Sequence, residues 1–560
     1  MQKNIDTQLT LALSMEDGTF DYSKELFVGF NPEENIWQLL IRYANDIEDL
    51  VESYQVDIIY LLGGYAIISI YSPYIEAFAR DPRILYIDKP KYIASQVSYA
   101  EYASCITSDI KNRMGLSGEG IIVGVIDSGI DIRHPEFLEN GNSRIMYLWD
   151  QTAAYDTENP NEYQYGRIYS NEEINDAISN NINISEDSGG HGTQVTGVAC
   201  GTNIGVANRA YIISVKLSSD INRPNTLGLI MGIDFCIKKS RELNIPVAIN
   251  LSYGNNYGSH QGDSLIENYI NDVGKMAKCS IITGTGNEGI TGRHIAGTLG
   301  NVTYKLIDIA VGDYVSAFNI QIWKNYQDLF DIVLYSPSGD NLIYLSERQP
   351  IARTTYRGNV IDCIYGVPNP YNRGQEIFIS ISRQGYVERG IWRVILYPKS
   401  IINGNYNAYL PVTTSTQANI NFLNPTEYGT LTVPSTTEGV ISVAAYNQNY
   451  NDYAYFSGRG FTPNNQIKPD IAAPGVDIYT SYPGGSYQFA SGTSIAAPFV
   501  TGSAALLMEW GILQGNDIFL YGEKLKAALI RGAKQLPVSR EYPNEYIGWG
   551  ALCLRNSLQS

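Results

Sequence analysis

The chain has 560 residues, which is enough for roughly two to four domains of about 100–200 residues each. Hydrophobic residues make up 44% and charged residues 17%, a balance typical of a well-packed protein and not of a disordered one. The net charge of −18 repels the phosphates of nucleic acids and the headgroups of anionic lipids. We therefore expect no nucleic-acid partner and no docking on anionic membranes.

Targeting segments and cysteine frameworks are not evident. The sequence begins without a basic region followed by a long apolar run, so we expect no secretion signal. No run of about 18 apolar residues occurs, so we expect no membrane span. The six cysteines are scattered and form no CxxC pair, which predicts reduced, mostly buried thiols instead of disulfides or a zinc site.

The first 90 or so residues predict a small α+β unit. In order, we expect a strand at 25–30, an amphipathic helix at 35–54, two strands within 56–71, a short helix at 72–82 capped by Ser72, and a last strand at 84–93. The order β-α-β-β-α-β is the ferredoxin-like pattern.

Continuous apolar runs then predict parallel strands that are covered on both faces. They lie at 121–127, 211–217, 246–252, 279–287 and 439–446, and helical patterns at 226–244 and 265–278 alternate with them. This alternation predicts a doubly wound α/β domain with a parallel sheet, in which functional groups gather beyond the carboxyl ends of the strands.

Between 300 and 428 the helical patterns stop and apolar and polar residues alternate, with turn signals between the segments. This pattern predicts an all-β sandwich or jelly roll inserted into the α/β domain, which resumes at 430–446. The expected domains are therefore 1–96, 97–299, 300–428 and 429–560, with both α/β segments forming one domain.

Three polar residues stand where the predicted sheet exposes its functional edge. Asp127 ends an apolar strand, while His191 and Ser494 each stand beside glycine at the start of an apolar helix. Taken singly, they could be a turn cap, a helix-start residue and a helix N-cap. Together they match a serine nucleophile, a histidine base and a carboxylate that orients the base, in one of the known chain orders.

The surrounding residues resemble the subtilisin-family (subtilase) serine peptidases. The stretches DSGID, HGTQVTG and GTSIAAP are similar to that family's three signatures, and the similarity covers about 115–300 and 430–555. The resemblance implies a serine endopeptidase with Asp127, His191 and Ser494 as its triad and with no cofactor. Some subtilases bind calcium through loop carboxylates, but no cluster here has metal-ligand spacing, so we expect no metal.

The same resemblance assigns two more segments. IITGTGNEG is similar to the oxyanion-hole segment, which implies that the Asn287 side-chain amide and the Ser494 N–H hold the oxyanion. NLSYG resembles the strand edge that pairs with substrate, and the glycine-rich strand end would form the facing wall of the P1 pocket, open enough for medium side chains. The implied substrate-binding residues are Ser252, Tyr253, Gly254, Gly284, Thr285 and Gly286.

The remaining histidines carry no predicted chemistry. His134, in RHPEF, is expected to be buried and hydrogen-bonded, while His260 and His294 are expected in solvated loops.

The N-terminal unit resembles a subtilase prodomain, although an unrelated domain is an alternative. A prodomain's tail lies in the active-site cleft, and here the tail is at 90–104. An apolar Ile93 at P4 would place Gln96 at P1 and Val97 at P1′, so we expect autoprocessing at Gln96–Val97, with neighbouring bonds as rivals. The chain's own prodomain would then be one of its partners.

A prodomain, no evident secretion signal and an inserted β-sandwich together resemble the Csp-type germination proteases of spore-forming bacteria, most like the catalytically competent CspB group. That resemblance implies a protein substrate, the zymogen of a spore cortex hydrolase, and a location in the spore. The insert could rigidify the protease or bind a partner. The rival function is a regulatory scaffold with an occluded triad; general nutrient proteolysis would need secretion.

Overall fold

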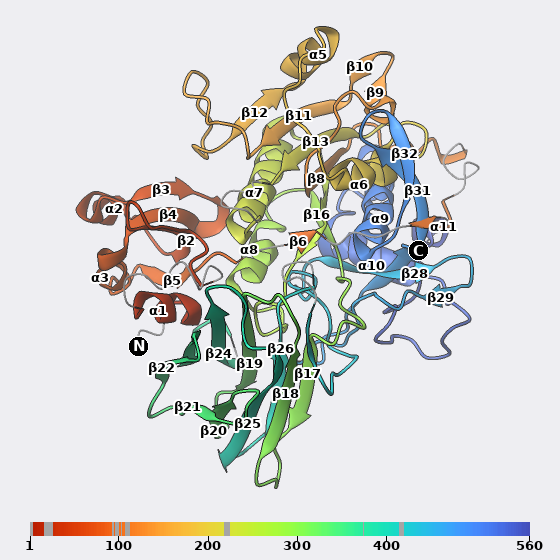
Figure 1. Ribbon diagram of the computed structural model, residues 1–560. Coiled ribbons are helices and arrows are strands. Elements are labelled where there is room, and N and C mark those ends of the chain that lie inside the picture. Colours follow the sequence, from red (N-terminus) through yellow and green to blue (C-terminus); the bar gives the residue numbers. More distant parts are fainter. Residues whose placement is uncertain are drawn as a thin grey trace. The chain divides into compact units, whose positions relative to one another are not determined.

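The computed structural model describes residues 4–15, 26–91, 94–95, 100–101, 104–106, 113–217, 224–372, 374–413 and 419–559 (Figure 1). The chain divides into two compact units. The first unit comprises Met1–Tyr92, Asn255–Leu265 and Ile290–Gly429, and the second unit comprises Ile93–Gly254, Ile266–Gly289 and Thr430–Ser560.

The second unit is built on a mostly parallel sheet of nine strands in the order β12-β11-β13-β8-β14-β16-β28-β29, with β30 beside β28. Its strands are β8 (Ile122–Asp127), β11 (Ile145–Asp150), β12 (Arg167–Ser170), β13 (Tyr211–Lys216), β14 (Val247–Leu251), β16 (Cys279–Gly284), β28 (Ile441–Asn447), β29 (Asp452–Tyr453) and β30 (Ile471–Pro474). Every residue of the central β8, β14 and β16 is buried, as strands covered on both faces require. The predicted α/β fold is confirmed.

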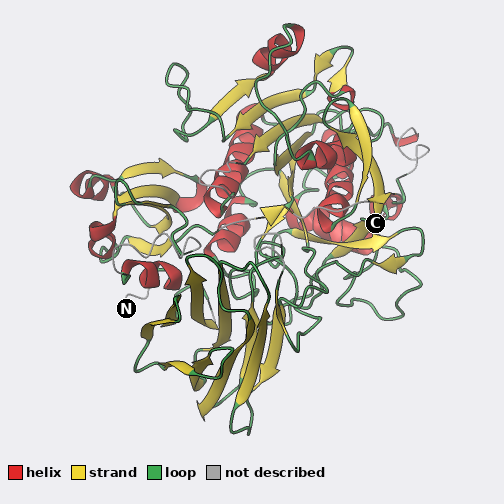
Figure 2. Cartoon of the chain, viewed as in Figure 1, coloured by secondary structure: helices red, strands yellow, loops and turns green. Residues whose placement is uncertain are grey.

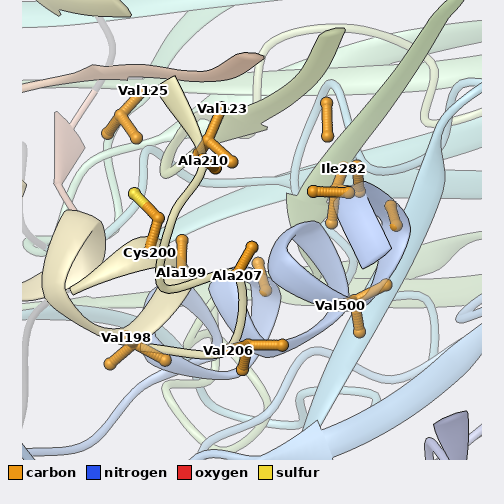
Figure 3. Close-up of a cluster of buried hydrophobic side chains, with 14 of the residues drawn as sticks. Val123, Val125, Val198, Ala199, Cys200, Val206, Ala207, Ala210, Ile282 and Val500 are labelled. Carbon is orange, nitrogen blue, oxygen red and sulfur yellow. The ribbon is translucent and has the colours of Figure 1, made fainter. Parts of the chain in front are cut away.

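Helices cover both faces of this sheet (Figure 1). They are α5 (Asn171–Ser179), α6 (His191–Cys200), α7 (Thr226–Leu243), α8 (Leu265–Val273), α9 (Thr493–Met508), α10 (Gly522–Gly532) and α11 (Leu554–Gln559). Figure 3 shows side chains of α6 and α9 gathered with Val123, Val125 and Ile282 of the sheet in one apolar cluster. Gly502 brings the two helices together, because a Cβ there would meet Ala199 O at 2.6 Å and Val206 Cβ at 2.5 Å.

Short strands complete the unit: β6 (Ala94–Ser95), β7 (Ala100–Glu101), β9 (Leu138–Glu139), β10 (Asn142–Ser143), β15 (Tyr253–Gly254), β31 (Asp477–Tyr482) and β32 (Ser486–Ala490). The helical stretch Thr493–Leu513 is long and apolar enough to cross a membrane by composition alone. However, 89% of its most apolar window is buried inside the described structure, as expected of a core helix.

The first unit contains the N-terminal subdomain, which we define as residues 4–91. Its sheet has the order β5-β2-β4-β3, with β1 beside β2. The elements are α1 (Thr7–Leu13), β1 (Phe30–Asn31), β2 (Ile36–Tyr43), α2 (Glu48–Tyr54), β3 (Asp57–Tyr60), β4 (Tyr65–Tyr71), α3 (Ile75–Phe78) and β5 (Ile84–Asp88). Apart from α1 and the short β1, the chain order is β-α-β-β-α-β, so the ferredoxin-like prediction is confirmed.

Individual elements of this subdomain differ from the expectation. The predicted helix at 35–54 is wrong in its first half, because Ile36–Tyr43 forms the central strand β2. An apolar run buried between two neighbouring strands has no clear period, and its β-branched and aromatic residues favour a strand. Within the expected strand at 25–30, residues 26–29 form a turn. Ser72 is the first residue of a 3₁₀ turn instead of the cap of a helix.

The β-insert, which we define as residues 294–422, is a sandwich of two antiparallel sheets (Figure 2). One sheet has the order β17-β26-β19-β24-β23-β22, and the other has the order β21-β20-β25-β18-β27. The strands are β17 (His294–Thr298), β18 (Lys305–Val311), β19 (Ala317–Asn325), β20 (Leu329–Tyr335), β21 (Asn341–Leu345), β22 (Ile351–Tyr356), β23 (Asn359–Tyr365), β24 (Gly374–Arg383), β25 (Gly390–Ser400), β26 (Asn405–Tyr409) and β27 (Ile420–Phe422). The predicted inserted all-β domain is confirmed.

Helix α1 joins the N-terminal subdomain to the β-insert within the first unit. Asp6 caps the helix by accepting a hydrogen bond from the Leu9 N–H. Leu9 packs into the core of the N-terminal subdomain. Leu11 packs with Ile364 and Phe378 of the β-insert. The helix therefore contributes apolar side chains to both cores.

A buried group of charges lies at the same junction. Lys91 contacts Asp88 and lies 3.5 Å from Asp6, while Glu376 of β24 accepts a hydrogen bond from Gln8 at 3.3 Å. Burial, with repulsion from Asp6, raises the pKa of Glu376 to about 8. Burial also raises the pKa of Asp88 to about 6, although Lys91 opposes that change. Three carboxyl groups thus lie close to Lys91, away from water.

We predict that Glu376 makes the first unit less stable at alkaline pH. Its ordinary pKa is 4.5, and its folded pKa of about 8 means that folding favours the protonated form. The stabilisation is complete below about pH 4.5 and is lost as the pH rises through about 8. Hydrogen exchange of α1 and β24 amides should show this loss in the wild type, and Glu376→Gln should remove most of it.

The matched control is Glu52→Gln, which neutralises an exposed carboxylate on α2 of the same unit. It should keep the wild-type pH dependence. Equal pH dependence of amide protection in all three proteins would contradict the assignment of the alkaline loss to Glu376.

Candidate active site

Asp127 and His191 are positioned by the end of a strand and the start of a helix. Asp127 is the last residue of the buried β8, and its Oδ1 accepts a hydrogen bond from the Ser128 N–H at 2.7 Å. His191 is the first residue of α6, immediately after Gly190. Gly190 has φ of +73°, and a Cβ there would meet the Tyr482 ring at 2.3 Å. Glycine is therefore required immediately before the histidine.

The structure brings the three predicted triad residues together. His191 Nδ1 lies 2.7 Å from Asp127 Oδ1, and His191 Nε2 lies 3.0 Å from Ser494 Oγ. Asp127, His191 and Ser494 are 1%, 3% and 0% exposed. Three elements that are distant in sequence, β8, α6 and α9, thus place a carboxylate, an imidazole and a hydroxyl in one hydrogen-bonded line.

The electrostatic setting favours a proton on the imidazole. Burial opposes the charged form of His191, but attraction and a hydrogen bond from Asp127 outweigh it, and Asp187 adds to them. The net result is a His191 pKa above its ordinary value. A raised pKa makes the neutral imidazole a stronger base, which is suited to accept the proton of the serine hydroxyl.

Asn287 lies next to the segment that carries Ser494. Its Oδ1 accepts hydrogen bonds from the Thr493 N–H at 3.1 Å and from the Thr493 hydroxyl at 3.2 Å. These two hydrogen bonds fix the orientation of the side-chain amide. Ser494 itself lies in the first turn of α9, at the positive end of the helix dipole. Both features suit the predicted oxyanion hole.

The predicted substrate edge forms a strand pairing. Tyr253 and Gly254 make up β15, which pairs antiparallel with β6, so that Tyr253 lies opposite Ser95 and Gly254 lies opposite Ala94. Ser252 precedes this pairing and is buried, with its Oγ accepting a hydrogen bond from Asn250 at 2.8 Å. The edge therefore accepts an extended segment, as strand addition requires.

The glycine-rich strand end is tightly packed. A Cβ on Gly284 would lie 2.8 Å from the Thr493 backbone, and one on Gly286 would lie 2.5 Å from Thr432. Thr285 bonds through its own carbonyl to the Thr432 N–H at 3.0 Å. Packing thus accounts for the small residues here, and the size of the P1 pocket stays a prediction.

The predicted solvent exposure is wrong for two of the other three histidines. His134 is buried and hydrogen-bonded as expected, with Nε2 2.9 Å from Ser486 O. However, His260 and His294 are also buried and stack on Tyr409, with ring centroids 3.8 and 4.6 Å away. Burial lowers the pKa of His294 to about 4. Glycine and polar neighbours suggested loops, but the β-insert supplies an aromatic partner from far along the sequence.

Two other predictions concern the autoprocessing bond and metal binding. Gln96 and Val97 lie outside the described residues. In the part of the chain that the structure describes, no group of three or more His, Cys, Asp or Glu side chains is placed to hold a metal ion.

Sequence reasoning missed Asp187, four residues before His191. Its buried carboxylate bonds both to the turn after Asp127 and to the first turn of α6. A carboxylate shortly before a helix N-terminus is a recognisable capping signal and could have been noted. The contact to Ser128 has no such signal, since 59 residues separate the two.

Comparison with known protein families shows where this chain belongs. Residues 118–362 and 403–550 match the Subtilase family, Peptidase S8. The chain belongs to the subtilase family. Residues 3–91 match the Csp protease B prodomain, so the N-terminal subdomain is a prodomain of that kind.

Similar solved structures and curated relatives support this family assignment. The CspB protease of Clostridium perfringens is 35% identical with a TM-score of 0.74, covering 81% of this chain and 95% of that one. Fervidolysin from Fervidobacterium pennivorans shares the fold at 14% identity, with a TM-score of 0.51 over 98% of this chain and 62% of that one. Subtilisin-like protease 3 of Trichophyton equinum is 27% identical over 40% of this subtilase and 46% of its own length. The chain thus spans about half the length of such curated relatives.

We predict that Gly190→Ala disturbs the active site while Gly189→Ala does not. Alanine at 190 would be strained by the positive φ and would collide with Tyr482, whereas a Cβ at 189 meets nothing within 4 Å. Urea denaturation should show a loss of about 1–3 kcal/mol for Gly190→Ala, the usual cost of such strain. The reaction of Ser494 with a fluorophosphonate should also slow. Equal behaviour of the two variants would show that the turn does not position His191.

Proposed function

We propose that this subtilase is a serine endopeptidase that removes its own prodomain and then activates a spore cortex hydrolase zymogen during germination. The observation that carries the peptidase assignment is the hydrogen-bonded line from Asp127 through His191 to Ser494. A bare serine hydroxyl is a poor nucleophile, and this line supplies the base that it needs.

The chemistry follows from the atoms in that line. Ser494 Oγ attacks the peptide carbonyl carbon while His191 Nε2 takes the hydroxyl proton, and the carbonyl electrons move onto oxygen. Asn287 and the N-terminus of α9 hold this oxyanion. Collapse of the intermediate breaks the C–N bond, and His191 gives its proton to the leaving amine. Water then releases the acyl group from Ser494 by the same steps.

Pairing between β6 and β15 supports autoprocessing close to Gln96. In antiparallel pairing, Ala94 lies opposite Gly254 and Ser95 lies opposite Tyr253. If Ser252 takes the P1 residue and Gly254 takes P3, the same register assigns P1 to Gln96 and P1′ to Val97. The proposed cut is therefore the Gln96–Val97 bond, with Ala94 and Ser95 as P3 and P2.

The proposed physiological role rests on the relatives. Similarity to the CspB protease of Clostridium perfringens and to the Csp protease B prodomain supports a Csp-type function. By resemblance to that group, the substrate is the zymogen of a cortex-lytic hydrolase and the site of action is the spore. The rival is a regulatory scaffold, which the pairing of 94–95 with the substrate edge would suit if no cleavage followed.

We predict that purified protein cuts itself and that Ser494→Ala stays joined to its prodomain. Loss of the nucleophile leaves no covalent route, while the fold should survive the removal of one buried hydroxyl. Sequencing of the mature N-terminus should give Val97. The control Ser338→Ala, at an exposed turn of the β-insert, should be processed like the wild type.

Processing of pure Ser494→Ala would mean that another protease does the cutting, and a mature N-terminus outside 94–100 would reject the proposed bond. The processed enzyme, incubated with candidate spore zymogens, should cut one of them at a single site that Ser494→Ala leaves intact. A wild-type protein that neither cuts itself nor reacts with a fluorophosphonate, even after its prodomain is removed, would support the scaffold.

A further inference from the structure

Asp187 lies in the segment before α6 and is 4% exposed. Its carboxylate accepts four hydrogen bonds. The Ser128 hydroxyl donates to Oδ1 at 2.7 Å and the Gly190 N–H donates to Oδ1 at 3.0 Å. The N–H and the hydroxyl of Thr193 donate to Oδ2 at 2.8 and 2.7 Å. Both oxygens are thus satisfied, which is what a buried carboxylate needs.

These donors belong to the two segments that carry the proton-transfer line. Ser128 directly follows Asp127, and Thr193 stands two residues after His191 in the first turn of α6. Each hydroxyl oxygen also accepts a hydrogen bond from a backbone N–H. The Gly192 N–H donates to Ser128 Oγ at 2.9 Å, and the Asp131 N–H donates to Thr193 Oγ1 at 3.0 Å. The turn after β8 and the start of α6 are therefore cross-linked around one carboxylate.

We propose that Asp187 is a positioning residue for the reaction: its buried carboxylate locks the turn carrying Asp127 to the helix carrying His191 and places a second negative charge beside the imidazole. The inference rests on the proposed function. Asp187 touches neither the substrate nor the reacting atoms, and it acts through Ser128 and α6.

The charge has a direct effect on the imidazole. Burial lowers the pKa of His191, but Asp127 raises it more strongly, and the charge of Asp187 raises it further. Tyr253 of β15 faces the same two carboxylates, and its pKa is raised chiefly by burial and further by their charges. Two nearby cations have other partners. Lys216 of β13 forms an ion pair with Asp150, with Nζ 3.1 Å from Oδ2. Arg133 donates a hydrogen bond from Nη2 to Ile182 O at 2.6 Å.

None of the hydrogen-bond partners of Asp187 among the described residues is cationic, so its charge is not cancelled locally by an ion pair. A negative charge near His191 favours the imidazolium that forms when Ser494 gives up its proton. The same carboxylate therefore has two separable effects, one on geometry and one on the pH at which the base works.

The test compares Asp187→Asn with Glu186→Gln in the processed enzyme. Asp187→Asn removes the charge and cannot accept all four hydrogen bonds, whereas Glu186 is an exposed neighbour outside the network. The rate at which a small fluorophosphonate modifies Ser494 is measured across pH. Asp187→Asn should move the acid limb to lower pH and reduce the maximum rate by at least ~10-fold, because a displacement of about 1 Å can cost 10²-fold. Glu186→Gln should match the wild type.

A second variant separates the two effects. Ser128→Ala removes the bridging donor but keeps the Asp187 charge, so the maximum rate should fall while the acid limb stays in place. A direct titration of the His191 ring proton by NMR gives the same comparison without turnover. The titration still reports the pKa of His191 if Asp187→Asn reacts too slowly with the fluorophosphonate to be measured.

An Asp187→Asn profile that falls by one factor at every pH, with an unmoved acid limb and an unchanged imidazole titration, would overturn the charge effect. Wild-type rates in Ser128→Ala would overturn the positioning effect. If the wild type itself fails to react, the peptidase proposal fails, and that result is distinct from either of these.

Discussion

Everything in the active site depends on one buried imidazole held between a carboxylate and a hydroxyl. His191 can bridge Asp127 and Ser494 only if a strand end and two helix starts meet to within a fraction of an ångström, although 64 and 303 residues separate His191 from its two partners. The doubly wound sheet meets this requirement, because its central strands end at one edge and α6 and α9 pack closely against them. Glycine at 190 and 502 permits the close approaches on which that packing relies.

Much of this unit could be predicted from the sequence. The strands with Ile122 and Ile281 are mostly apolar and buried throughout, because both faces are covered, and such runs are hard to mistake in a long α/β pattern. The predicted triad followed from short motifs in which the residue types carry the chemistry, and the structure brings its three side chains together. Their distances could not be predicted, since they result from packing between segments far apart in the chain.

The errors share one physical origin. Trp37 to Ile41 form a strand buried by neighbouring strands, and without those neighbours an apolar run also suits a helix. His260 and His294 are buried because Tyr409 stacks between them, and Asp187 matters because Ser128 reaches it. In each case a tertiary partner that is distant in sequence decides the role of the residue.

The first unit shows the same dependence on distant partners. Asp6, Asp88 and Glu376 come from α1, the end of β5 and the β-insert, yet they lie close to Lys91 in one buried group. Such a group is costly to bury. It lies where the N-terminal subdomain and the β-insert contact each other within the first unit.

The most direct measurement is the site and rate of fluorophosphonate modification in the wild type and in His191→Ala, each after its prodomain has been removed. If the hydrogen-bonded line activates the serine, mass spectrometry will find the phosphonyl group on Ser494 in the wild type. The rate in His191→Ala will fall by at least ~10³-fold, in keeping with the loss of a triad base. Modification of another residue, or an unchanged rate without the imidazole, would contradict the account.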